Sequence, residues 1–169
     1  MLNCPRFLID AVGRYCAEHG IALNVRADGW LLVLQRADRR HLIFGYDLGL
    51  NSAVAHRLAS DKAATAELLT LARVPAVPHA FFIAPTFNGD AEIPWPSIVG
   101  LLDAHPAGLV VKPNEGTSGR FVTRVSRRDQ LAHAVNGLFA TNANVAISPY
   151  LDIEDEVRVV LLDGNPLLV

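Results

Sequence analysis

The chain is organised around one stretch, Leu109-Val110-Val111-Lys112-Pro113-Asn114-Glu115-Gly116-Thr117-Ser118-Gly119-Arg120-Phe121-Val122. A short apolar run ends in a lysine, a loop of small and polar residues follows, and the chain becomes apolar again at Phe121. This pattern predicts a strand, a flexible loop and a second strand that continues to Val125.

The composition of the loop suits an anion. Gly116 and Gly119 remove side chains where a backbone must approach a ligand closely. Thr117 and Ser118 add hydroxyl groups, and successive backbone N–H groups in such a turn form a concavity for an anion. Lys112 would supply a point charge for a phosphate at the mouth of the loop. An ordinary glycine-containing hairpin with a solvated lysine explains the same residues.

The composition describes a globular chain. Of its 169 residues, 51% are apolar and 19% are charged, which excludes a disordered protein. No apolar run approaches the ~20 residues that span a bilayer, and the first residues lack the pattern of a signal peptide. The net charge of −2 gives no general attraction for nucleic acid or anionic lipid. Cys4 and Cys16 show no metal spacing, so we expect a cytoplasmic protein.

The first 51 residues predict a small αβ module, and residues 52–169 predict a second domain. The module should contain a helix over residues 5–19 and strands over 21–25, 30–34 and 41–46. The expected elements of the second domain are helices over 52–59, from Ser60 as N-cap to about residue 72, over 96–104 and from Ser126 to Phe139, and strands over 80–83, 109–112, 121–125, 145–148, 157–162 and from 167. The last strand is cut short at Val169, so we expect a piece of a longer protein.

The order of the polar motifs resembles the first half of an ATP-grasp ligase. Ser60-Asp61-Lys62 opens a helix, Val74-Pro75 follows it, the stretch around Lys112 comes next, and Ser148-Pro149-Tyr150-Leu151 and Glu156 close the series. That superfamily includes D-Ala:D-Ala ligases, ribosomal-protein glutamate ligases and cyanophycin synthetases. The resemblance covers about residues 45–169 and implies an α+β fold: a small N-terminal module, the lid subdomain of the family and the start of its second subdomain.

The resemblance implies a role for each matching position. Lys62 and Lys112 would bind the phosphates of ATP, and a lid of Glu115, Gly116, Thr117, Ser118 and Gly119 would close over them. Val110 would pack on the adenine. The hinge that bonds the edge of the base would be Ser148, Pro149, Tyr150 and Leu151. Glu156 would accept hydrogen bonds from the ribose.

Two positions depart from the pattern of the family. Its members often carry an acidic side chain at the first hinge position, near the adenine amine, where this chain has Ser148. The acidic run before Glu156 is also about one residue long for the family, so Glu154 or Asp155 is an alternative for the ribose.

The chemistry that the resemblance implies is the joining of a small carboxylate to an amine or a thiol through an acylphosphate made from ATP. Positioning and charge neutralisation dominate such catalysis. Magnesium is expected for the complete protein, but the family's magnesium ligands lie in its second half, so we assign no metal ligand here and expect this span alone to be inactive.

A module that binds a nucleotide or a protein without catalysis is the alternative function. Its unfinished sheet edge could pair two copies into a homo-oligomer. The six histidines show no ligand spacing, and we expect no direct role for them: His19, His41, His56, His79, His105 and His133.

Overall fold

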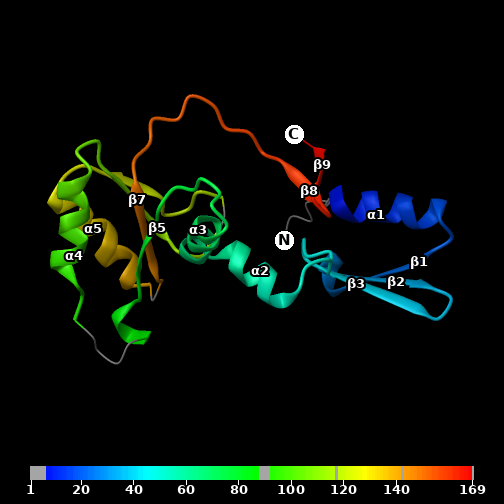
Figure 1. The fold of residues 1–169 in the computed structure, drawn as a ribbon. Helices are drawn as coiled ribbons and strands as arrows, with labels where there is room; N and C mark the ends of the chain where they lie inside the picture. Colours follow the sequence, from blue (N-terminus) through cyan, green and yellow to red (C-terminus); the bar gives the residue numbers. More distant parts are fainter. Residues whose placement is uncertain (1–6, 88–91, 117, 142, 169) are drawn as a thin grey trace. The chain divides into compact units, whose positions relative to one another are not determined.

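The computed structural model describes residues 7–87, 92–116, 118–141 and 143–168. The chain divides into two compact units, Met1–Arg57 and Leu58–Val169 (Figure 1). Helices and antiparallel sheets make up both units, so the expected α+β class is confirmed. In the described residues, every helix is too short or too polar to cross a bilayer.

The first unit is one helix with a three-stranded meander. Its elements are helix α1 (Phe7–Glu18), strand β1 (Ala22–Arg26), the 3-10 turn η1 (Ala27–Gly29), and strands β2 (Leu31–Arg36) and β3 (Arg39–Phe44). The antiparallel order is β1-β2-β3, and the paired strands bury Leu32 and Ile43. Helix α2 (Ala53–Ser60) follows.

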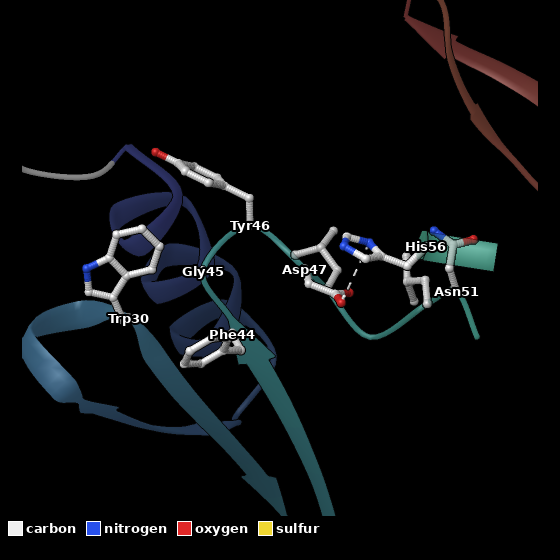
Figure 2. A pocket seen from close by; sticks show the side chains of 9 residues that line it. Trp30, Phe44, Gly45, Tyr46, Asp47, Asn51 and His56 are labelled. Atoms are coloured by element: carbon white, nitrogen blue, oxygen red, sulfur yellow. Dashed lines mark ion pairs between the residues drawn. The ribbon is translucent and has the colours of Figure 1, made fainter. Parts of the chain in front are cut away.

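A cavity of about 520 Å³ opens in this unit where β3 ends (Figure 2). Its lining is mostly aromatic and aliphatic, and Phe44 and Tyr46 are largely exposed. The polar groups are few: Asn51, and Asp47 with an oxygen 3.9 Å from Nδ1 of His56. No lysine or arginine is among the described residues that line it, so this cavity does not suit a phosphate.

The second unit is built on a four-stranded antiparallel sheet of order β4-β7-β5-β6. Its elements are helix α3 (Lys62–Leu71), strand β4 (Ala80–Phe82), the 3-10 turn η2 (Pro85–Phe87), helix α4 (Trp95–Ala104), strands β5 (Leu109–Pro113) and β6 (Thr123–Val125), helix α5 (Arg128–Phe139) and strand β7 (Val145–Pro149). The two strands expected on either side of the glycine loop, β5 and β6, are therefore neighbours in the sheet.

The two faces of this sheet have different characters. Leu109 and Val111 of β5 point to the face that carries the core, where the buried cluster also includes Ile98, Leu131, Val135, Leu138, Val145 and Ile147. Because side chains alternate along a strand, Val110 and Lys112 point to the opposite face. The register places Arg124 and Ser148 opposite Val110, so they share that second face. Candidate site residues thus lie on the face away from the core.

Gly108 directly precedes β5, and both its backbone conformation and its neighbours disfavour a side chain. Its φ is +101°, a conformation that side chains rarely adopt. A Cβ placed there would lie 2.6 Å from the carbonyl oxygen of Val125 on β6. Glycine is therefore required where the backbone of β6 approaches the start of β5.

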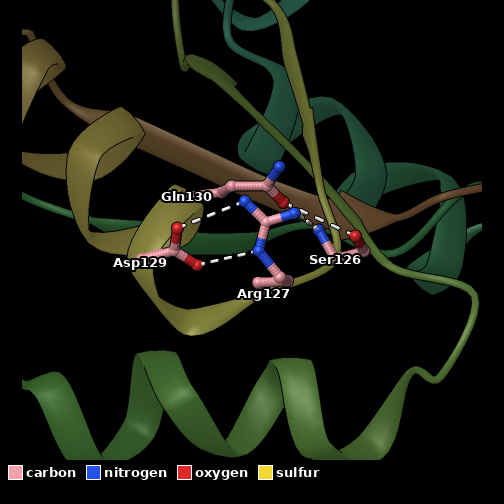
Figure 3. A network of polar contacts seen from close by, with 4 residues as sticks. All are labelled: Ser126, Arg127, Asp129 and Gln130. Atoms are coloured by element: carbon pink, nitrogen blue, oxygen red, sulfur yellow. Dashed lines mark hydrogen bonds and ion pairs between the residues drawn. The ribbon is translucent and has the colours of Figure 1, made fainter.

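The structure corrects one expected helix start and refines another. The N-cap of α3 is Asp61 and not Ser60: an Asp61 carboxylate oxygen accepts from the Ala64 N–H at 2.8 Å. Helix α5 begins at Arg128, and the Gln130 side chain accepts from the Ser126 N–H at 3.0 Å (Figure 3). In the same network Arg127 donates to both carboxylate oxygens of Asp129, at 3.1 and 3.2 Å, and this contact lowers the pKa of Asp129.

The last strands form a hairpin of β8 (Val160–Leu162) and β9 (Asn165–Leu168). The expected strand over 157–162 was too long, because the pairing with β9 begins at Val160. Both strands are exposed throughout their described lengths. They turn at Asp163 and Gly164, as the sequence indicates.

Replacing Gly108 with alanine should lower the free energy of unfolding by about 1–3 kcal/mol for the positive φ, plus the cost of moving the β6 backbone. Gly100→Ala is the matched control, because Gly100 lies within α4 and a Cβ there meets no atom within 4 Å. It should leave stability unchanged or raise it by up to about 1 kcal/mol. Urea unfolding followed by far-UV circular dichroism measures both, and equal stability of the two variants would contradict the role of Gly108.

Candidate functional site

A cavity of about 370 Å³ lies in the second unit, between the start of α3, the segment before β4, and β5. Three of its side chains can carry positive charge: Lys62, His79 and Lys112. The rest of its lining is small or apolar: Ala59, Thr65, Ala66, Leu69, Ala76 and Val77. No carboxylate is among the described residues that line it. An apolar cavity of this size with a few convergent polar groups is typical of a ligand site.

Lys62 ties the first residue of α3 to the segment that enters the glycine loop. Its ammonium group donates to the carbonyl oxygens of Pro113 at 2.9 Å, Asn114 at 3.2 Å and Gly116 at 3.3 Å. An ammonium group has three N–H donors, so these bonds use all of them. Burial lowers the pKa of Lys62, and the nearby carboxylates of Asp61 and Glu115 oppose that shift. Lys62 therefore acts in this structure as a clip between helix and loop.

Asn114 completes the same junction, although no sequence pattern predicted a role for it. It is 1% exposed, its N–H donates to the Asn144 carbonyl at 2.8 Å, and its carbonyl accepts from the Lys62 N–H at 3.2 Å. Its side-chain oxygen accepts from the Ala63 N–H at 3.1 Å. Its buried Nδ2 has no hydrogen-bond partner within the described residues. Asn114 thereby satisfies two of the free N–H groups at the start of α3, those of Lys62 and Ala63.

Within the described part of the chain, Lys112 makes no hydrogen bond and no ion pair. It stands on β5, opposite Ala146 of β7, and is half-buried. Burial, and then repulsion from Lys62, lower the pKa of Lys112. Its positive charge is thus less favourable at this place than it would be in water.

His79 lines the same cavity as the two lysines, although its spacing in the sequence predicted no role for it. Its Nδ1 lies 2.8 Å from the Val77 carbonyl oxygen. Burial, and then the charge of Lys112, lower the pKa of His79, with a smaller contribution from Lys62; the hydrogen bond to Val77 opposes them. The shift brings the ring to its neutral form at neutral pH.

The residues expected to contact the adenine base, Val110 and the hinge from Ser148, are not part of the lining of this cavity. Val110 and Ser148 are paired across β5 and β7 on the same sheet face as Lys112. Strand β4 pairs with β7 only as far as Ile147, so the predicted hinge begins where that pairing ends. Beyond Pro149, the Tyr150 N–H donates to the Gly108 carbonyl at 3.0 Å.

The hinge makes one further contact, through the ring of Tyr150. The guanidinium carbon of Arg124 lies 3.5 Å from the centre of the Tyr150 ring, which is a cation–π contact. The next hinge residue, Leu151, is 49% exposed. Arg124 therefore covers one face of the Tyr150 ring.

The lid and ribose positions are less constrained. Glu115 forms an isolated bridge with Asp61, Ser118 and Gly119 have φ of +63° and +67°, and Thr117 lies outside the described residues. Glu156 is exposed and accepts from Arg158 at 3.2 Å. Glu154 and Asp155 are exposed as well. The roles of all these residues, and the choice among the three carboxylates, stay predictions.

Among the described residues, no three histidine, cysteine, aspartate or glutamate side chains gather closely enough to hold a metal ion. The magnesium expected for the complete protein has no assigned ligand in this chain.

No protein-family model matches the sequence, and no curated protein matches it. Among solved structures, a D-alanine–D-alanine ligase from Bacillus anthracis is 20% identical over 62% of this chain and 37% of its own, with a TM-score of 0.44. D-alanyl-alanine synthetase A from Vibrio cholerae is 15% identical over 88% of this chain and 50% of its own, with a TM-score of 0.46. A bifunctional glutathione synthetase from Pasteurella multocida is 18% identical over 80% of this chain and 18% of its own, with a TM-score of 0.40.

These proteins are ATP-grasp enzymes, the superfamily whose motif order the sequence resembles. The chain spans between 18% and 50% of their lengths. All three TM-scores are below 0.5.

Lys62→Met should loosen the junction of α3 with the loop, because it removes three hydrogen bonds of a charged donor. We expect a loss of about 1.5–3 kcal/mol in the free energy of unfolding and faster amide exchange over residues 113–116. Lys112→Met is the matched control, since it removes the same charge from the same cavity but breaks no described hydrogen bond. It should leave loop exchange unchanged and keep or raise stability. Hydrogen exchange by mass spectrometry and urea unfolding test both, and equal effects would refute the clip.

The stability of the second unit should fall in mild acid because of His79. Its pKa in the folded protein lies below its ordinary value of 6.5. As pH falls through that value, the unfolded chain binds a proton that the folded chain does not. The unfolded state therefore becomes more stable relative to the folded state. The loss should level off below the folded pKa. Urea midpoints measured from about pH 8 to about pH 5 should fall less in His79→Gln than in the unchanged protein; parallel curves would show that His79 titrates normally.

Proposed function

We propose that the second unit is the ATP-binding portion of an ATP-dependent carboxylate–amine or carboxylate–thiol ligase, with the phosphates of ATP in the cavity of Lys62 and Lys112. The observation that carries this proposal is the pairing of two lysines in one cavity whose described lining contains no carboxylate. The proposal extends to a cytoplasmic location, as the cysteine usage suggests.

The electrostatics of the cavity favour an anionic ligand. Burial, and then repulsion from Lys62, lower the pKa of Lys112, so the unliganded site carries an energetic cost at neutral pH. An anion between the two groups removes that cost and adds charge-assisted hydrogen bonds, which are the strong ones. A phosphate chain supplies several negatively charged oxygen atoms as acceptors. The apolar part of the lining suits a ligand that also has an organic portion.

The two lysines have different roles in this proposal. Lys112 has no described partner and is the direct phosphate ligand. Lys62 already donates to three carbonyl oxygens, so it positions the loop and contributes its charge from a fixed place. It becomes a direct ligand only where a phosphate oxygen replaces one of these carbonyls. The longest of the three bonds, to Gly116, is the one most easily exchanged.

The rest of the nucleotide would extend along the second face of the sheet. Val110 packs on the base, and backbone groups of the hinge from Ser148 to Leu151 bond its edge. Glu156, or its neighbours Glu154 and Asp155, bonds the ribose. The lid residues from Glu115 to Gly119 cover the phosphates and keep water from the acylphosphate. The carboxylate and its partner nucleophile would be held by residues of the complete protein.

A nucleotide-binding or interaction module without catalysis is the second candidate. The exposed apolar residues of the β8–β9 hairpin favour it, since Leu161, Leu167 and Leu168 are each more than half exposed. A second copy of the chain would then cover the hairpin. Sedimentation velocity over a range of concentrations tests for that dimer, and Leu161→Glu should abolish it.

Titration of the chain with ADP in an isothermal calorimeter tests the phosphate role. Lys112→Met should weaken binding about 10- to 100-fold, which corresponds to the loss of one charge-assisted hydrogen bond. Arg128→Met removes the same charge elsewhere, from an exposed ion pair with Asp103 on α4, and should leave the affinity unchanged. ADP affinity that is equal in the unchanged protein and in Lys112→Met would refute the proposal.

A further inference from the structure

His79 is held by its backbone neighbour in one tautomer. A carbonyl oxygen can only accept, so the Nδ1 that lies 2.8 Å from the Val77 carbonyl oxygen carries the proton. In the neutral ring the other nitrogen, Nε2, is then an acceptor. Nε2 is buried and has no hydrogen-bond partner among the described residues. A buried polar atom of this kind requires a reason, because leaving it unpaired is costly.

The groups around His79 explain why it stays neutral without a ligand. Lys112 faces it from β5 and Lys62 faces it from α3, and all three line one cavity. The carboxylates of Asp61 and Glu115 act on Lys62, and no carboxylate is among the described residues of the lining. A proton on Nε2 would therefore place a third positive charge beside two others in a partly buried space.

We propose that His79 is a proton-dependent third cation of this cavity, and that a bound oxyanion accepts a hydrogen bond from its protonated Nε2. The inference rests on the proposed function, because the oxyanion is a phosphate group of the nucleotide. An anion offsets the repulsion from both lysines and gives Nε2–H an acceptor. Anion binding and protonation of His79 then promote each other, since coupling between two binding events is reciprocal. The chain should bind oxyanions more tightly in mild acid, with uptake of a proton.

Sulfate is the probe that isolates this coupling, because it keeps both negative charges throughout the relevant pH range, whereas phosphate groups titrate there themselves. Calorimetry with sodium sulfate at constant ionic strength should show an affinity that rises from about pH 8 to about pH 5.5, by up to about tenfold if the anion raises the pKa of His79 by about one unit. Near the middle of this range, the binding enthalpy should vary with the ionisation enthalpy of the buffer, which measures proton uptake. Side-chain nitrogen chemical shifts should show Nε2 of His79 gaining a proton when sulfate is added.

Two variants separate the role of His79 from a structural one. His79→Gln keeps a polar side chain that binds no proton, so its sulfate affinity should no longer depend on pH and its proton uptake should vanish. His79→Leu removes the polar atom and should bind sulfate as weakly at acidic pH as at alkaline pH. Wild-type folding of the glutamine variant is checked by its urea midpoint at about pH 8, where His79 is neutral in both states.

The outcomes distinguish this inference from the proposed function. Sulfate affinity that is independent of pH in the unchanged protein, or dependent on pH to the same extent in His79→Gln, overturns the role of His79. If ADP affinity still depends on Lys112, the proposed function survives that result. If ADP affinity does not depend on Lys112, the proposed function fails by itself. Absence of sulfate binding at every pH also overturns the inference.

Discussion

The second unit depends on the junction between the start of α3 and the segment that leaves β5. Lys62 and Asn114 make this junction from opposite sides: an ammonium group donates to three carbonyl oxygens, and a buried amide oxygen accepts from the next N–H of the helix. Residues more than fifty positions apart are thereby joined. The junction fixes the helix against the sheet and, in doing so, sets the distance between Lys62 and Lys112. The contacts that hold the fold together therefore also place the charges of the site.

The consequence is a cavity whose positive potential is only partly compensated. Three carbonyl oxygens neutralise much of the Lys62 charge locally, while the positive end of the α3 dipole lies at the same place. Asp61 and Glu115 lower the potential near Lys62, but the pKa of Lys112 and that of His79 still move down. Stability alone would favour an apolar residue at position 112. Under the proposed function, an anionic ligand offsets the cost of keeping a charge at this position.

Much of the fold was readable in the sequence, and the limits of that reading have physical causes. The periodicity of α5 and the short apolar run of β5 identified both elements, because local apolar spacing follows the geometry of helix and strand. The N-cap of α3 was misplaced by one residue, since Ser60 and Asp61 are both good caps and only the backbone geometry chooses between them. Asn114 and His79 were missed because their significance comes from partners distant in sequence.

Lys112 could be selected from the sequence because it lies between an apolar run and a glycine loop, and Lys62 because of the resemblance, whereas nothing selected His79. Within Leu109–Pro113, every second side chain enters the core, so a lysine in the strand must face the other side, and a charge beside a glycine loop attracts notice. His79 follows Pro78 outside any regular element, where no period assigns its side chain to a face. Its place is decided by the chain's turn into β4, which brings the ring to the cavity that Lys112 enters from β5. A sequence pattern therefore identifies side chains that a helix or strand orients. Side chains that a loop orients can be identified only once the tertiary contacts are known.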